Sequence, residues 1–224
     1  MSNSLQTQME WELFAGVPEE NVRRLLSIAR RRTFGRGEVV FHRGDPADCL
    51  HLIVSGRFAV GITTPLGSTA LLGVRGPGEA FGELALVGSG DHRSATVAAL
   101  EQAETRSVLA GDFERLRHEY PSVDGLLVRL LGERVRRLSE QLTDAYYLPA
   151  ETRVLRRLVE LGNLYSGCIP LPQEQLAELA GTSRATANRV LRDLQRRGVL
   201  ELGRSTVTVL EPEDLLRRSG VRQQ

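Results

Sequence analysis

The sequence contains no lysine, so all 29 of its basic residues are arginine. The guanidinium group presents a planar fork of N–H donors that suits phosphate groups and guanine edges. Two compatible interpretations stay open: a compositional bias of a GC-rich genome, and a chain in which every cation can make a two-pronged contact. With 28 acidic residues the net charge is +1, which neither indicates nor excludes a nucleic-acid partner.

Cysteines are scarce and long apolar runs are absent. Cys49 and Cys168 lie far apart, and neither stands in a Cys-x-x-Cys or Cys/His pattern, so we expect two buried thiols and no metal. The four histidines are equally scattered. No apolar run approaches the roughly eighteen residues of a membrane span, and the amino terminus lacks a secretory pattern, so we expect a cytoplasmic protein without a membrane partner.

Signatures of catalysis are absent as well. The sequence has no Walker loop, no Gly-x-Gly-x-x-Gly after a strand and no catalytic-triad order. We therefore expect that the protein is not an enzyme.

The 224 residues suit two domains, and the apolar pattern changes along the chain. Helical spacing predicts a helix from Pro18 to Arg30. From about Thr33 to Ala110, short β-rich runs alternate with glycines, a pattern typical of an antiparallel roll. The runs are EVVF, LHLIVSG, FAVGIT, ALLGV, SATVAAL and TRSVLA.

A long helix with an apolar seam follows, from Leu126 to Tyr146. The seam residues alternate three and four positions apart, which is the heptad spacing of a two-stranded coiled coil: Val128, Leu131, Val135, Leu138, Leu142 and Ala145. The opposite face is charged, which favours self-association over the alternative of a core-facing stripe. Pro149 then begins a helix from Ala150 to Leu161 and places a hinge at residues 146–149.

The segment LPQEQLAELAGTSRATANRVLRDLQRRGVLEL, residues 171–202, has the layout of a helix-turn-helix. Pro172 begins the first helix, Gly181 makes the turn, and Thr182 or Ser183 caps the second helix. This second helix is expected to bury Val190, Leu191 and Leu194 and to expose Arg184 and Arg189. Its exposed arginines favour DNA binding over a merely solvated surface.

The next residues, GVLEL and TVTVL around a GRS turn, predict two strands that form a wing with Arg204 at its tip. The whole order of elements resembles the superfamily of the cyclic-AMP receptor protein and the fumarate-nitrate regulator (CRP/FNR). The resemblance runs through FGELALVGSGDHRSAT to QEQLAELAGTSRATANRVL. It implies an α+β fold: a β-roll of the cyclic-nucleotide-binding jelly-roll type at residues 9–122, a dimerisation helix and hinge at 123–148, and a winged helix-turn-helix at 149–219.

The resemblance also implies a ligand and its contacts. Gly82 and Leu84 would contact the ligand through their backbone, Glu83 would accept the ribose 2′-hydroxyl, and Arg93 with Ser94 would hold the cyclic phosphate. The alternative is that Glu83 and Arg93 pair with each other. The implied ligand is cAMP, with cGMP as a possibility.

The seam helix would complete the ligand site. By the resemblance, Arg134 reaches the ligand, and Leu138 and Ser139 face the base, one from each subunit. Leu138 replaces a threonine of the cAMP receptor, which removes a hydrogen bond worth about 0.5–1.5 kcal/mol and adds apolar area to the seam. Arg75, on the strand before Gly76, either pairs outward or contacts the ligand.

For DNA, the resemblance assigns guanine contacts to Arg184 and Arg189. It assigns phosphate contacts to Ser183 and Thr186, and Ala185 stands where the cAMP receptor has a glutamate that reads cytosine. Contacts to DNA are also expected from Gln173 and Arg204.

The implied function is that of a homodimeric transcription regulator that binds a palindromic DNA site under control of a cyclic nucleotide, with RNA polymerase as a further partner. The alternative is a regulator of the same fold that uses another signal or none. An iron-sulfur cluster is disfavoured because only Cys49 lies in the amino-terminal half.

Overall fold

The computed structural model describes residues 14–63, 69–87 and 92–220. The chain divides into two compact units, the first formed by residues 1–62 and 74–137 and the second by residues 63–73 and 138–224. Residues 9–13, where the first domain was expected to begin, lie outside the described ranges. In the described residues, no helix has both the length and the apolar character that crossing a membrane requires.

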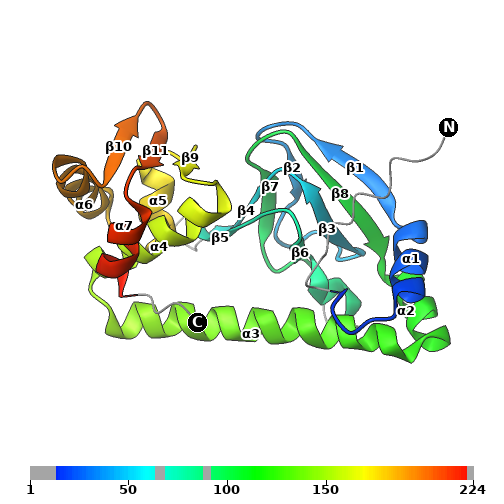
Figure 1. Ribbon diagram of the computed structural model, residues 1–224. Helices are drawn as coiled ribbons and strands as arrows, with labels where there is room; N and C mark the ends of the chain where they lie inside the picture. Colours follow the sequence, from blue (N-terminus) through cyan, green and yellow to red (C-terminus); the bar gives the residue numbers. More distant parts are fainter. Residues whose placement is uncertain (1–13, 64–68, 88–91, 221–224) are drawn as a thin grey trace. The chain divides into compact units, whose positions relative to one another are not determined.

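Eight described strands form two four-stranded sheets with the orders β1-β8-β3-β6 and β2-β7-β4-β5 (Figure 1). β8 pairs with β1 and β3, β3 with β6, and β7 with β2 and β4, all antiparallel. The strands are β1 (Arg30–Phe34), β2 (Val39–Phe41), β3 (Cys49–Ser55), β4 (Phe58–Thr63), β5 (Thr69–Arg75), β6 (Ala80–Phe81), β7 (Thr96–Ala99) and β8 (Ala103–Leu109). The expected β-roll is therefore present.

The sequence did not predict β1 or β6. The first helix ends at Ile28, and β1 begins at Arg30, where the sequence pattern extended the helix. β1 is an edge strand that exposes its four polar residues, and Arg31 forms an ion pair with Glu104 of β8 at 2.7 Å. An edge strand of this kind has no apolar alternation for a sequence pattern to detect.

The central strand β3 separates two apolar cores because successive side chains of a strand point to opposite faces. Leu50 and Leu52 face the helices, whereas Ile53 packs inside the roll against Phe34 and Phe58. All three side chains are fully buried. β3 is thus the common wall of both cores, which explains its run of buried residues.

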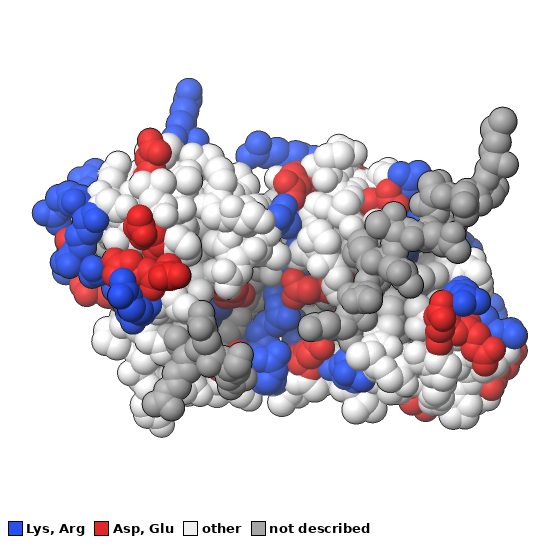
Figure 2. Space-filling model, viewed as in Figure 1, with Lys and Arg blue, Asp and Glu red and all other residues white. Residues whose placement is uncertain are grey.

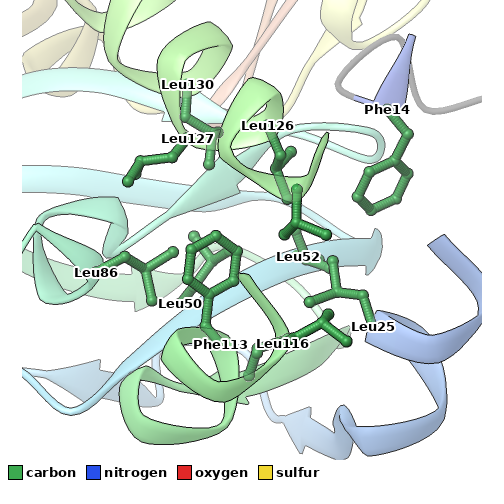
Figure 3. Close-up of a cluster of buried hydrophobic side chains, with 12 residues drawn as sticks. Phe14, Leu25, Leu50, Leu52, Leu86, Phe113, Leu116, Leu126, Leu127 and Leu130 are labelled. Carbon is green, nitrogen blue, oxygen red and sulfur yellow. The ribbon is translucent and has the colours of Figure 1, made fainter. Parts of the chain in front are cut away.

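Helices cover the outer face of β3. They are α1 (Glu19–Ile28), α2 (Ala110–Glu119), the short 3-10 turn η3 (Pro121–Val123) and the first turns of α3 (Asp124–Tyr147). Figure 3 shows Leu50 and Leu52 packed with Phe113 of α2 and Leu126 of α3. Leu127 and Leu130 of α3 join the same cluster. This packing fixes the amino-terminal part of α3 against the roll.

The part of the second unit that follows α3 is a winged helix-turn-helix. Its described elements are α4 (Ala150–Leu164), β9 (Cys168–Ile169), α5 (Gln173–Leu179), α6 (Arg184–Arg196), β10 (Leu200–Gly203), β11 (Thr206–Val209) and α7 (Pro212–Ser219). The wing sheet has the order β10-β11-β9, so β9 adds a third strand to the two that were expected. α7 packs against α4 and was not expected either.

Cys49 is buried as expected, but Cys168 is exposed, so the expectation of two buried thiols was wrong for Cys168. Cys168 belongs to a strand of two residues at the edge of the wing sheet, and only its neighbour Ile169 faces the core.

The seam of α3 is largely open to solvent in the single chain. Five of its six apolar residues are exposed: Val128, Val135, Leu138, Leu142 and Ala145. The sixth, Leu131, is partly buried against the core. Leu126, Leu127 and Leu130 form a different stripe, which faces the roll.

Candidate functional site: a cationic cavity and a helix-turn-helix

The first unit contains a cavity of about 260 Å³ beside β6 and the amino-terminal part of α3. Its lining includes Gly82, Glu83, Leu84, Arg93, Ser94 and Arg134, which are the sequence-predicted ligand residues apart from Leu138 and Ser139. Five arginines and three glutamates line it, so positive charge exceeds negative by two. A site of this composition suits a small anion.

Gly82 makes room for Arg93. It lies between β6 and the 3-10 helix η2 (Glu83–Leu86) with φ = 82°, in the left-handed region that favours glycine. A Cβ at this position would lie 2.7 Å from Arg93 Nη1 and 2.9 Å from the Cys49 carbonyl oxygen. The glycine therefore serves both the chain reversal and the close approach of the guanidinium.

Arg93 is buried, at 6% exposure, and is held from several sides. Its Nη1 donates to the Cys49 carbonyl at 2.7 Å, and its Nη2 donates to Asp48 Oδ1 at 2.9 Å. The guanidinium carbon lies 4.1 Å from the ring centroid of Phe41. These contacts fix the orientation of the group before any ligand arrives.

One donor of this guanidinium has no acceptor. Arg93 Nε is buried and makes no hydrogen bond within the described part of the chain. A buried donor without a partner costs about 1–3 kcal/mol, and a phosphate oxygen is a suitable acceptor for it. The site therefore fits an anionic ligand.

Two of the groups beside Arg93 are neutral, and the acid that pairs with it is exposed. Cys49 Sγ lies 3.2 Å from Arg93 Nη2 and 3.4 Å from His51 Nε2. Burial raises the pKa of the Cys49 thiol, and burial together with the charge of Arg93 lowers the pKa of His51 to about 3. Both groups are neutral at pH 7, and Asp48, the acid paired with Arg93, has a largely exposed side chain.

Glu83 and Arg93 do not pair with each other, which was the alternative to a ligand site. Glu83 Oε1 lies 3.9 Å from Arg134 Nε, and Arg93 pairs with Asp48. The contact between Glu83 and Arg134 is at the outer limit of an ion pair, so the carboxylate can accept a further donor. Glu83 is itself buried.

A second ionic group lines the cavity and was not predicted. Glu79 Oε1 accepts from Arg137 Nη2 at 2.9 Å and lies 3.8 Å from Arg75 Nε, while Glu79 Oε2 accepts from the Gly76 N–H at 2.8 Å. Arg75 is buried and lines the cavity, which favours a contact with the ligand, the second of its two predicted roles. Arg137 of α3 also lines the cavity.

Leu138 and Ser139 are not brought to the cavity in the single chain. Both are exposed residues of α3 that belong to the second unit.

In the second unit, α5 and α6 form the helix-turn-helix. Gly181 has φ = 57°, and of the two possible caps it is Ser183 that caps α6, where its Oγ accepts the Thr186 N–H at 3.1 Å. Val190, Leu191 and Leu194 are buried as expected. Arg184 and Ala185 are exposed at the start of α6, Gln173 is half-buried at the start of α5, and Arg204 is exposed in the β10–β11 turn.

Basic side chains gather over the end of this unit that α6 forms, with acidic side chains beside them (Figure 2). One arginine of α6 already has a partner: Arg189 Nη2 lies 2.6 Å from Glu151 Oε1 of α4. Sequence reasoning missed Glu151 because nothing in the sequence relates α4 to α6.

Arg153 connects α4 to the turn of the helix-turn-helix, and the sequence did not single it out. It donates from Nε to the Ala180 carbonyl at 2.9 Å, from Nη2 to the Gly181 carbonyl at 2.8 Å, and from Nη1 to the Leu148 carbonyl at 2.9 Å. One side chain thus joins the turn to the residue that follows α3.

The fold and the two sites together define a class of protein: a ligand-binding β-roll joined to a winged DNA-binding domain. Comparison with known families agrees with both parts. Residues 31–120 match the cyclic nucleotide-binding domain family, and residues 152–218 match the Crp-like helix-turn-helix domain family.

The chain belongs to the CRP family of transcription regulators. It is 38% identical to the cyclic AMP receptor protein of Thermus thermophilus over 89% of this chain and 92% of the relative. It is 33% identical to the CRP-like cAMP-activated global transcriptional regulator of Mycobacterium tuberculosis over 92% of this chain and 96% of the relative. These relatives and domains are those of regulators and not of enzymes, as expected.

A solved structure agrees with the fold. The c-di-GMP responsive global regulator CLP of Xanthomonas campestris superposes with a TM-score of 0.74 at 25% identity, over 85% of this chain and 98% of that one. The α+β architecture and the family resemblance drawn from the sequence are confirmed.

Proposed function

We propose that this chain is a homodimeric cytoplasmic regulator that binds a palindromic DNA site under control of a cyclic nucleotide, with cAMP as the ligand and cGMP as a weaker one. The parts are a sensing domain at residues 9–122, a dimerisation helix and hinge at 123–148, and a DNA-binding domain at 149–219. The names of the relatives support cAMP as the ligand. RNA polymerase is proposed as a further partner of a transcription regulator.

The buried guanidinium of Arg93 carries the proposal for the ligand. It is oriented by main-chain and carboxylate contacts and retains a buried Nε donor without an acceptor. A cyclic phosphate supplies that acceptor, with the Ser94 hydroxyl beside it, while Glu83 accepts the ribose hydroxyl. Gly82 and Leu84 contribute backbone groups, and Arg134 reaches the ligand from α3.

Calorimetric titration of the purified chain with cAMP and with cGMP tests this ligand. We expect binding of one cAMP per chain and weaker binding of cGMP. Arg93→Ala should lower the affinity about 100-fold or more, because the charge-assisted hydrogen bond from Nε and the positive charge beside the phosphate are both lost. Arg36→Ala, at an exposed arginine of the same unit, should leave it unchanged. If Arg93→Ala binds cAMP with the same affinity as the wild-type chain, the assignment is refuted.

The exposed seam of α3 supports the dimer. Pairing two copies along Val128, Val135, Leu138 and Leu142 would remove large apolar side chains from water, and Leu138 alone would contribute about 1–2 kcal/mol. In that dimer Leu138 and Ser139 would approach the base. Leu142→Glu should shift sedimentation from the dimer toward the monomer. Leu210→Glu, at an exposed leucine outside the seam, should not.

For DNA, the proposal assigns guanine contacts to Arg184 and Arg189 and phosphate contacts to Ser183 and Thr186, with Gln173 and Arg204 also at the interface. Ala185 has no acceptor for cytosine N4, so we expect little discrimination at the base pair that a glutamate would read. Binding to four operators that differ only at that pair tests this: strong discrimination there would contradict the assignment.

The second candidate is a regulator of the same fold that does not depend on cAMP. Two observations favour it: Leu138 stands where the cAMP receptor has a threonine, and the c-di-GMP responsive CLP has the same fold. The calorimetric titration, extended to c-di-GMP, separates this candidate from the first.

A further inference from the structure

We infer that Glu151 is a positioning residue of the DNA-binding surface, one that holds Arg189 away from phosphate groups and so restricts binding to sites that offer a guanine. The inference rests on the base-contacting role proposed for Arg189.

The geometry of the pair carries the inference. Arg189 Nη2 and Glu151 Oε1 are 2.6 Å apart, and the two side chains are 68% and 55% exposed. Glu151 belongs to the first turn of α4, whereas Arg189 lies on α6, so the contact joins two helices of the same unit. An ion pair this exposed is weak, which means that a strong ligand of the guanidinium can displace the carboxylate.

The two kinds of DNA contact differ in their ability to displace it. Guanine O6 and N7 accept both prongs of an arginine in a fixed geometry, and such a contact contributes base discrimination. A phosphate oxygen attracts the guanidinium without sequence preference, and the carboxylate of Glu151 competes with it for the same group. At an operator the docked interface holds a guanine edge opposite Arg189, whereas on other DNA no acceptor is fixed there, so Arg189 leaves Glu151 at an operator and stays paired with it for more of the time on other DNA.

Arg189 differs in this respect from the other arginine assigned to guanine. Arg184 is exposed at the first position of α6, and the described ion pairs of the chain include none to it. Of the two arginines assigned to bases, only Arg189 would thus have to leave a carboxylate of the protein in order to contact DNA.

The alternative role of Glu151 is to stabilise α4, because an acidic side chain in a first turn interacts favourably with the helix dipole. Glu151→Asp keeps that charge on a side chain one methylene shorter, which weakens its reach to Arg189. Glu151→Gln removes the charge. Glu213→Gln is the matched control, because Glu213 is an exposed acid in the first turn of α7.

The experiment measures anisotropy with two labelled duplexes: one selected by the wild-type chain from a random pool, and a scrambled duplex of the same composition. At low salt, Glu151→Gln should bind the scrambled duplex about five- to tenfold more tightly and the selected one about two- to threefold more tightly. The salt slope on the scrambled duplex should steepen by about one, since one more phosphate contact is made. Glu151→Asp should change in the same direction.

The double variant decides whether Glu151 acts through Arg189. In an Arg189→Ala background, Glu151→Gln should raise the affinity for the scrambled duplex by no more than Glu213→Gln does. An equal gain in both backgrounds would overturn the inference and leave only general repulsion of DNA by Glu151. If instead Arg189→Ala binds the selected duplex with unchanged affinity and base preference, the role proposed for Arg189 fails, and that result is distinct from a failure of Glu151.

Discussion

Arg93 of the cavity and Arg189 of α6 are both assigned to ligands, but the protein holds them in opposite ways. Arg93 is buried and oriented by the Cys49 carbonyl, Asp48 and the ring of Phe41. Arg189 is exposed and held by a single carboxylate. Replacing the buried group lowers the free energy of unfolding, whereas the exposed group can change its partner with little change in free energy.

The largest effect that this comparison predicts is at Gly82. Gly82→Ala should destabilise the first unit by about 3 kcal/mol or more, because the new methyl group meets Arg93 and the Cys49 carbonyl in a left-handed backbone conformation. Ligand binding should be lost with it. Thermal unfolding and calorimetry measure both effects.

Gly37→Ala is the control for Gly82→Ala, because Gly37 has φ = 81° but no atom within 4 Å of an added Cβ. It should cost only the backbone strain of about 1–2 kcal/mol. Equal destabilisation by the two variants would mean that the position of the Arg93 guanidinium does not depend on the absence of a side chain at Gly82.

Replacing Arg93 and Arg189 by lysine, one at a time, tests the comparison directly. Arg93→Lys should lower the free energy of unfolding by about 2–3 kcal/mol, since the amine cannot reproduce the bonds to both Asp48 and the Cys49 carbonyl. Arg189→Lys should leave stability within about 0.5 kcal/mol of the wild type and should weaken only DNA binding. Urea unfolding of both variants gives the answer, and similar losses of stability would contradict the distinction.

The two units should also differ in their response to acid. His51 is buried and stacked on Phe81, and burial lowers its pKa from 6.5 to about 3. The unfolded chain therefore binds the proton first, and the stability contributed by neutral His51 is lost as pH falls from about 6.5 toward 3, by about 2 kcal/mol at pH 5. The second unit has no histidine, because all four precede residue 119.

Hydrogen exchange, corrected for the pH dependence of the chemical rate, separates the two units. Amides of β3 should lose protection between pH 7 and pH 5 and those of α6 should not. His51→Gln should remove most of the loss in β3. Persistence of that loss in the variant would assign it to other groups.

The smallest expected effect is at the cap of α6. Ser183→Ala should cost about 1 kcal/mol, because the Thr186 N–H loses its acceptor. Thr182→Ala should cost less, since Ser183 is the residue that caps the helix. Hydrogen-exchange protection of the first amides of α6 and the affinity for DNA measure the difference. A larger effect of Thr182→Ala than of Ser183→Ala would contradict the observed cap.

The comparison also separates what the sequence could predict from what it could not. Apolar alternation and turn glycines predicted the strands that line the roll, and the Gly181 turn and helical spacing predicted α5 and α6. Strand β1 was missed because its residues before Phe34 are polar and exposed. These elements follow from local patterns, which a sequence carries directly.

The surroundings of both arginines depend on contacts between distant residues and had no local signal. Asp48 lies 45 positions before Arg93, and Glu151 lies on a helix separate from that of Arg189. Glu79 and Arg137 were missed for the same reason, since they are 58 positions apart. The family resemblance supplied the roles of Arg93 and Arg189 without the groups that hold them.

The central claim is that a cyclic nucleotide held by Arg93 controls the affinity of the two α6 helices of the dimer for DNA. Titration of the selected duplex with the full chain, with and without saturating cAMP, tests it most directly. The account predicts a gain in DNA affinity that stays below about 100-fold, because the seam contact proposed for Leu138 would favour the DNA-binding dimer without ligand, and that disappears in Arg93→Ala. Identical affinities of the wild-type chain with and without cAMP would contradict it.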